Sequence, residues 1–211
     1  MSTLRTITGF KERLAGGGAR PNLFEVSIPK MPNGIAWNGE VQRTFNFLCD
    51  ASSMPASTVD PINVPFRGRI LKVAGDRTID IWSVTVINDE DFAIRTAFEQ
   101  WANLISKLDN ASGATSPSAY MVDAYVHQLG RGYDRNKFST TNSSVFSEGS
   151  TRPLRTYKMY DIWPSSIGAI ELSYADNNTI ERFTVDFQVQ WWTVGETAAG
   201  SSADQAGVVV R

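Results

Sequence analysis

The sequence predicts a mainly β protein, an antiparallel β-sandwich or barrel with one flanking α-helix. Segments with apolar residues at every second position recur along the chain, and this is the period of a half-buried strand. One segment has instead a long apolar stripe at helical spacing. Strands and helices do not alternate as a parallel sheet requires, so the strands are expected to pair antiparallel. A chain of 211 residues, 42% of them hydrophobic, is large enough to bury such a core.

Residues 1–19 are predicted to form an N-terminal assembly arm ahead of a β domain over residues 20–192. Apolar residues recur in this arm at spacings of three and four, as in a short amphipathic helix: Leu4, Ile7, Phe10 and Leu14. Three glycines at 16–18 then predict a hinge. Two interpretations stay open, a frayed terminus or an arm whose apolar stripe docks on a neighbouring subunit.

The first two strands are expected over residues 23–29 and 44–49. In the second, Phe45, Phe47 and Cys49 fall on one face, so Cys49 is expected to be a small core residue. It is the only cysteine, and a single cysteine cannot form a disulfide within the chain.

The next segment, residues 54–65, contains three prolines and is expected to be irregular or an edge. Strands over residues 69–74 and 78–87 follow, joined by a turn at Gly75-Asp76. The second of these strands has apolar residues on both faces. That pattern indicates either cover on both sides or a bulge that switches the faces.

The helix is expected over residues 88–108. Asn88 is suited to cap it, and the acidic residues at 89–91 suit the positive end of the helix dipole. The apolar stripe, which is expected to pack on a sheet, consists of Ile94, Ala97, Phe98, Trp101, Ile105 and Leu108.

After the helix, strands are expected over residues 119–129, 153–163 and 169–174. The polar segment at 130–152 is predicted to be a long loop insertion, and such loops are usually functional or disordered. Residues 193–211, rich in glycine, alanine and serine, are predicted to be a C-terminal tail.

The last strand, over residues 180–192, has the clearest alternation in the chain. Its apolar face consists of Phe183, Val185, Phe187, Val189 and Trp191. Its polar face consists of Thr184, Asp186, Gln188 and Gln190. A slip by one residue would expose the whole apolar face, so the pattern fixes the register.

Residue types that enzymes and metal sites need are scarce. With one histidine, His127, and one cysteine, neither a multi-histidine site nor a Cys-x-x-Cys site is possible. No phosphate loop, dinucleotide fingerprint or serine nucleophile motif occurs. The sequence therefore predicts a protein that is not an enzyme, with no catalytic residue, no cofactor and no metal.

Charge and hydropathy exclude further classes. The chain has 20 basic and 22 acidic residues. The sequence contains no concentrated basic patch of the kind that binds phosphates. No apolar run approaches the roughly 20 residues that span a bilayer, and the first residues lack the core of a signal peptide. We expect a chain that is made and folded in a cytoplasm and has no membrane partner.

Five short segments along the chain form a recognisable series: RPNLF at 20–24, VAGDRT at 73–78, WSVTV with NDE between 82 and 90, WPSSIG at 163–168 and DNN at 176–178. In order and at comparable spacing, they resemble segments of the tail tube proteins of contractile-tailed (myovirus-type) bacteriophages. The resemblance covers roughly residues 20–192, and the segment at 130–151 and the tail after Trp192 depart from the family's pattern.

The resemblance implies a fold and a function. It implies a β-sandwich-like subunit with a flanking helix, six copies of which form a ring with a continuous inner β-barrel. Stacked rings would form the inner tube of a contractile tail, through which the genome passes on ejection. The implied partners are other copies of the chain, the tail sheath protein, and the baseplate and tail-terminator proteins. The tape-measure protein and double-stranded DNA would occupy the lumen transiently, in a virion tail assembled in the host cytoplasm.

Two surfaces are candidates for this assembly. A DNA channel should be polar without being basic, so we expect Thr184, Asp186, Gln188 and Gln190 to line the lumen. The alternative is an ordinary solvent-facing side of a sheet. Ring stacking needs parts that reach along the axis, and the predicted stacking residues in the arm and near the hairpin are Leu4, Ile7, Phe10, Leu14, Arg67, Arg69 and Asp76.

Alternative functions remain at this point. The nearest ones share the fold: a baseplate tube initiator, or a tube subunit of a type VI secretion-like injection system. A small-ligand-binding β-barrel is the alternative from a different class, and it would need a closed apolar pocket with a few converging polar groups. A single-stranded nucleic-acid binder would need aromatics along a basic groove, for which the few basic residues near Tyr133 are insufficient.

Overall fold

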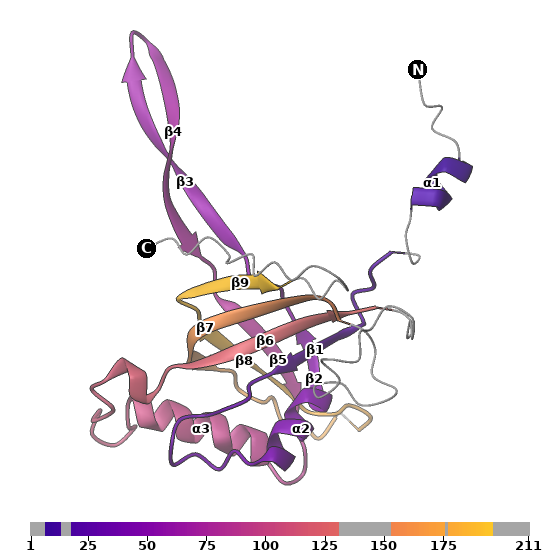
Figure 1. Ribbon diagram of the computed structural model, residues 1–211. Helices are drawn as coiled ribbons and strands as arrows, with labels where there is room; N and C mark the ends of the chain where they lie inside the picture. Colours follow the sequence, from indigo (N-terminus) through magenta and orange to yellow (C-terminus); the bar gives the residue numbers. More distant parts are fainter. Residues whose placement is uncertain (1–6, 14–17, 131–152, 176, 196–211) are drawn as a thin grey trace, which may run out of the picture. The chain divides into compact units, whose positions relative to one another are not determined.

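The computed structural model describes residues 7–13, 18–130, 153–175 and 177–195 (Figure 1). The chain divides into two compact units. One consists of Val26–Val126 and Tyr157–Thr193. The other consists of Met1–Glu25, His127–Thr156 and Val194–Arg211.

A seven-stranded antiparallel sheet forms the centre of the fold, so the predicted mainly β class is confirmed. Its path runs β1-β6-β7-β8-β5-β2, and β9 pairs with β7. The strands are β1 (Phe24–Ser27), β2 (Cys49–Ser52), β5 (Trp82–Ile87), β6 (Val122–Leu129), β7 (Pro153–Ile167), β8 (Arg182–Gln188) and β9 (Trp191–Gly195). The end strands β1 and β2 are only four residues long.

Helix α3 (Ala93–Ile105) covers the apolar face of β5 and β8, as the apolar stripe predicts. Phe98 lies among rings from both layers, with centroids 5.8 Å from Phe187 and 6.5 Å from Phe183. Trp101 lies against Phe187 and donates its indole N–H to the Tyr120 carbonyl. Aromatic burial of this kind stabilises the packing of helix on sheet.

The helix is shorter than predicted at both ends. Phe92, at φ 52°, precedes its first turn without a side-chain cap, and Asn88 instead donates to a Glu181 carboxylate oxygen. Asn88 therefore fixes the end of β5 to the start of β8 and does not cap the helix. Leu108 lies beyond the C-terminal end of α3 and is 95% exposed, so it does not extend the apolar stripe of the helix.

A second helix, α2 (Gly39–Leu48), replaces the strand predicted over residues 44–49. The Asn38 side chain accepts hydrogen bonds from the backbone N–H groups of Glu40 and Val41, which is a strong helix start signal. Phe45 is buried but Phe47 is 86% exposed, so the predicted common face of Phe45, Phe47 and Cys49 is wrong. Cys49 is buried, as predicted, at the first residue of β2.

The prediction for residues 54–87 also needs correction. β3 (Ser57–Phe66) and β4 (Arg69–Ile79) form a two-stranded sheet of their own, although the prolines indicate irregular structure. The turn lies at Arg67-Gly68, and Gly75-Asp76 is a bulge within β4, opposite the step from Val59 to Pro61. Figure 1 shows this hairpin extending away from helices α2 and α3.

Three further differences concern the second half of the chain. Pro164 does not end β7, which continues to Ile167 with a register shift beside the proline. Residues 169–174, predicted as a strand, form no strand, and Leu172 and Tyr174 are exposed. The predicted strand over 180–192 is broken between β8 and β9, and Trp191 is exposed instead of sharing the buried face.

The described residues of the other unit include helix α1 (Ile7–Arg13), within the predicted amphipathic segment. The buried Gln128 side chain donates to the carbonyls of Arg20 and Leu23, at 2.8 and 2.7 Å. His127 Nδ1 lies 2.9 Å from Thr156 Oγ1. All of the predicted loop over 130–152 except Gly130, and most of the predicted tail over 193–211, lie outside the described residues.

Candidate assembly surfaces

The polar face of β8 lies opposite its buried residues, as the alternation predicts. Thr184 Oγ1 lies 3.1 Å from Thr85 Oγ1 on β5, and Ser83 Oγ donates to an Asp186 carboxylate oxygen. Cross-strand pairs of this kind hold polar side chains in place along a sheet. Thr184, Asp186 and Gln188 are half-buried, while Phe183, Val185 and Phe187 on the opposite face are buried.

Gln190 is separate from this face. β8 ends at Gln188, and Gln190 lies in the bend before β9, where its backbone N–H donates to the Tyr160 carbonyl at 3.3 Å. The strand alternation that groups Gln190 with Thr184, Asp186 and Gln188 therefore stops two residues earlier than the sequence indicates.

Two described cations on this side of the sheet have carboxylate partners. Arg182 Nε lies 2.9 Å from Asp50 Oδ2, and Lys158 Nζ lies 2.9 Å from Asp123 Oδ2. Lys158 also lies 4.2 Å from the centroid of the Tyr160 ring. Burial lowers the pKa of Lys158, but the hydrogen bond and charge of Asp123 outweigh it, so its pKa is raised and the ammonium stays charged.

The β3–β4 hairpin exposes an apolar face that the sequence reasoning missed. Register places Ile62 opposite Val73, Val64 opposite Leu71 and Phe66 opposite Arg69, and directly opposed residues share a face. All of these apolar side chains are exposed: Ile62, Val64, Phe66, Leu71 and Val73. The signal was present as the alternation at 62, 64 and 66, but the intervening Pro61 and Pro65 obscured it.

The predicted stacking residues lie on different elements. Arg67 and Arg69 lie at the hairpin tip, where the Arg67 guanidinium lies 5.5 Å from the Phe66 ring centroid, and Asp76 lies in the β4 bulge. Ile7 and Phe10 are exposed on α1. Leu4 and Leu14 lie outside the described residues, so the complete arm stripe stays a prediction.

The described residues also include two groups of possible chemical interest. Burial, followed by the charge of Asp50, raises the pKa of the Cys49 thiol to about 12, so it is protonated and unreactive at neutral pH. Burial lowers the pKa of His127, with a smaller opposing effect of Glu25. Within the part of the chain that the structure describes, no cluster of three or more His, Cys, Asp or Glu could hold a metal.

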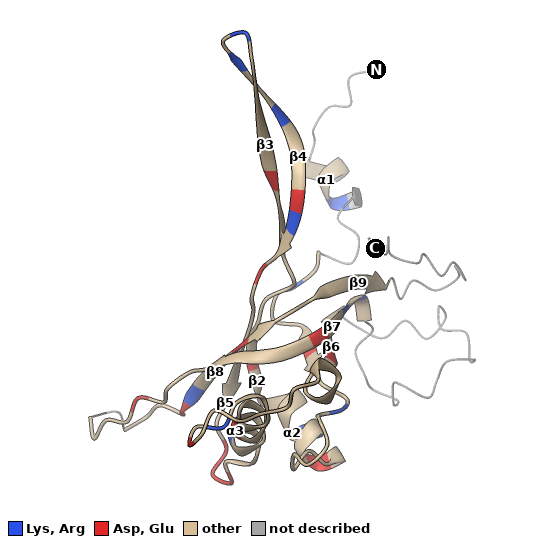
Figure 2. Ribbon diagram, turned by 90° about the vertical axis from the view of Figure 1, so that its left-hand side faces the viewer, with Lys and Arg blue, Asp and Glu red and all other residues tan. Residues whose placement is uncertain are grey.

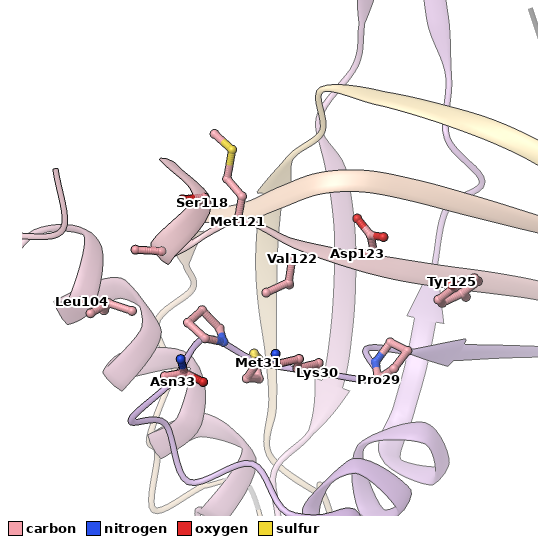
Figure 3. A pocket seen from close by; sticks show the side chains of 12 residues that line it. Pro29, Lys30, Met31, Asn33, Leu104, Ser118, Met121, Val122, Asp123 and Tyr125 are labelled. Atoms are coloured by element: carbon pink, nitrogen blue, oxygen red, sulfur yellow. The ribbon is translucent and has the colours of Figure 1, made fainter. Parts of the chain in front are cut away.

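A pocket of about 530 Å³ lies beside the start of β6, where Figure 3 shows Met31, Leu104 and Val122 with Lys30 and Asp123. The Asp123 carboxylate in this lining is paired with Lys158. The lining mixes apolar side chains with polar ones, among them Lys30, Asn33 and Ser118, so it is not the mainly apolar cavity that a small-ligand-binding β-barrel would need. No helix among the described residues is both long and apolar enough to cross a membrane.

Among the described residues, the exposed apolar face of the β3–β4 hairpin is a feature of a subunit that assembles with other proteins. The chain belongs to the phage tail tube protein family, which it matches over residues 19–195. It is therefore a structural component of the virion tail and not an enzyme, as the sequence predicts.

Individual relatives support this assignment. The chain is 32% identical to the tail tube protein gp19 of Enterobacteria phage T4 over 178 residues, 84% of this chain and 93% of the relative. It is 24% identical to the tail tube protein of Serratia phage KSP90 over 188 residues, 89% of this chain and 94% of the relative.

Solved structures share the fold. A chain in the cryo-EM structure of the anti-feeding prophage baseplate has a TM-score of 0.54 at 12% identity, covering 84% of this chain and 95% of that one. A chain in the sheath–tube complex of an extracellular contractile injection system has a TM-score of 0.51 at 14% identity, covering 88% and 97%. At these identities the likeness shows the fold alone.

Proposed function

We propose that this chain forms the inner tube of a contractile phage tail, as stacked rings of six whose lumen conducts the genome during ejection. The observation that supports this most is the polar face of β8. Phe183 and Phe187 lie against Phe98 of α3, so the alternating Thr184, Asp186 and Gln188 lie on the other side of the sheet. The one cation of β8, Arg182, is paired with Asp50. Gln190, beyond the end of β8, is proposed to extend this lumen surface.

A lumen of this composition suits rapid DNA transport. Free lysines or arginines would release counterions from the phosphates and hold the DNA, whereas hydroxyl, amide and carboxylate groups would not. Asp186 adds negative charge, which repels the phosphate backbone.

Ring closure would use the ends of the sheet. β1 and β2 are short end strands with one unpaired edge each among the described strands, and a head-to-tail contact between such edges closes a ring by rotation. The ring is thus proposed to be a homohexamer with a continuous inner sheet.

Stacking of rings would use two parts of the chain. The arm, with Leu4, Ile7, Phe10 and Leu14, and the hairpin, with Arg67, Arg69 and Asp76, are proposed to contact the adjacent ring. The tail sheath would surround the tube, with baseplate and terminator proteins at its ends and the tape-measure protein and DNA transiently inside.

A baseplate tube initiator or an injection-system tube subunit is the second candidate, because the fold is shared with a baseplate chain and with an injection-system sheath–tube complex. Copy number in purified particles separates a tube protein from an initiator, because a tube protein is abundant and an initiator is scarce. We expect many copies of this chain per particle.

The lumen assignment is tested by placing a cation on each side of the sheet. We expect Gln188→Lys to leave tube formation intact but to slow genome ejection from virions at least several-fold, because the new ammonium would hold phosphates. Asn103→Lys, on the exposed face of α3, is the matched control and should eject normally. Equal ejection rates, measured by release of fluorescently stained DNA at low salt, would rule out the lumen assignment.

A further inference from the structure

The two outer edges of the β3–β4 hairpin differ in their hydrogen-bonding capacity. Arg67 and Gly68 have φ values of 44° and 81°, which fit the two-residue type I′ turn of a tight hairpin. The pair that closes such a turn, Phe66 and Arg69, is a hydrogen-bonded pair. Hydrogen-bonded and non-hydrogen-bonded pairs alternate, so the pairs Pro65–Ile70 and Asn63–Lys72 are non-hydrogen-bonded.

Residues in non-hydrogen-bonded pairs direct their backbone N–H and C=O groups away from the partner strand. On β3 these residues are Pro61, Asn63 and Pro65. Both prolines lack an N–H, so the outer edge of β3 keeps one donor, that of Asn63, along this stretch. Proline on an edge is a recognised barrier to pairing with another strand.

The outer edge of β4 has no such barrier. The opposite partners of the three β3 residues are Ile70, Lys72 and Ala74, and each directs one N–H and one C=O outward. Within the described part of the chain, β3 and β4 pair only with each other. The hairpin therefore presents one blocked edge and one edge that can accept a strand.

Three observations indicate a second copy of this chain as the occupant. The apolar face of the hairpin is unburied, and in a tube of one repeating chain such a surface recurs beside every copy. All charged residues between positions 61 and 75 are basic, Arg67, Arg69 and Lys72, as Figure 2 shows near the tip. The same chain exposes a complementary acidic run at residues 89–91.

We propose that a second copy of this chain adds a strand to the outer edge of β4, and not to β3, and that side chains of the same copy cover the apolar face of the hairpin. This inference rests on the proposed stacking function and specifies its geometry. Main-chain hydrogen bonds to Ile70, Lys72 and Ala74 supply affinity, and the apolar side chains on the shared face supply specificity. The prolines of β3 fix the direction of growth, because they prevent addition on the other side.

The cross-strand pair Asn63–Lys72 offers a matched test in the full chain. Neither outward N–H is used within the hairpin, so proline at either position spares the β3–β4 ladder. We expect Lys72→Pro to reduce tube assembly at least tenfold by sedimentation and electron microscopy. Asn63→Pro should assemble normally, and Lys72→Gln, which removes only the charge, should lose less than half of the assembled fraction.

Circular dichroism and thermal melting identify the variants that fold. A Phe66→Asp variant tests the role of the apolar hairpin face independently of the outer edge of β4.

Equal assembly of Lys72→Pro and Asn63→Pro, or loss of assembly with Asn63→Pro alone, would overturn the assignment of the pairing edge to β4. If Lys72→Pro fails to fold, amide hydrogen exchange on wild-type tubes decides, since the N–H groups of Ile70, Lys72 and Ala74 should be slowed on assembly and that of Asn63 should not. Loss of assembly with Phe66→Asp alone leaves the stacking proposal intact, whereas a wild-type chain that forms no tubes contradicts the proposed function itself.

Discussion

Phe98 joins three elements of the core at a single residue. Its ring lies within 6.5 Å, between centroids, of Trp37, Phe45, Trp101, Phe183 and Phe187. Because these rings come from α2, α3, β8 and the segment before α2, removing Phe98 leaves a cavity that no single neighbour can fill.

The contrast between two phenylalanines tests this packing. Phe98→Ala should lower the free energy of unfolding by about 3–5 kcal/mol, the usual cost of truncating a buried ring. Phe47→Ala, on the exposed side of α2, should change it by less than about 0.5 kcal/mol. Urea denaturation measures both. A large loss with Phe47→Ala would instead support the strand predicted from the alternation of residues 45, 47 and 49.

The burial of Cys49 can be tested by its reactivity. Its thiol is buried and its pKa is about 12, so native protein should react slowly with an alkylating reagent at pH 8, and urea should restore rapid labelling. The control is Cys49→Ala with Ser53→Cys, which places a thiol at an exposed position. Labelling of native Cys49 at the rate of the exposed thiol would contradict the burial.

The same thiol links stability to pH. Its folded-state pKa lies above its unfolded value of 9.0, so the folded state holds the proton more tightly. The associated stability is fully present below pH 9 and is lost as the pH rises toward 12. A Cys49→Ala variant should lack this component of the decline.

Element boundaries show what periodicity predicts and what it misses. The alternation of β8 and the stripe of α3 are long enough to specify their buried faces, and both were correct over most of their length. α2 was missed because a three-residue alternation outweighed the helix start signal at Asn38. The hairpin was missed because proline argues against a central strand, whereas β3 is an edge strand in which the outward N–H is not needed.

The bulge in β4 depends on Gly75. A Cβ there would lie 2.6 Å from the Asp60 carbonyl oxygen and 3.0 Å from Ile62 Cγ1, so backbone must shift to admit it. We expect Gly75→Ala to speed amide hydrogen exchange in β3 and β4 several-fold and to reduce tube assembly. The neighbouring exposed Ala74→Ser should leave exchange unchanged. Unaltered exchange in Gly75→Ala would show that the strands are less closely apposed than described.

At the scale of the whole molecule, the sequence indicated the family and the class of function, but only part of the assembly surfaces. The resemblance rested on five short segments, and the family match over residues 19–195 confirms it. The polar face of β8 could be predicted from the two-residue period of the strand alone. The apolar hairpin face did not, because it depends on a register that only the positions of the turn and the bulge determine.

Copies of this chain are proposed to assemble into a tube with the polar face of β8 inside. Cryo-electron microscopy of the purified protein distinguishes this arrangement from others. We expect stacked six-membered rings in which Thr184, Asp186 and Gln188 face the lumen and the β3–β4 hairpin contacts the adjacent ring. Tubes with these side chains on the outer wall, or a chain that stays monomeric at concentrations where tubes are expected, would contradict it.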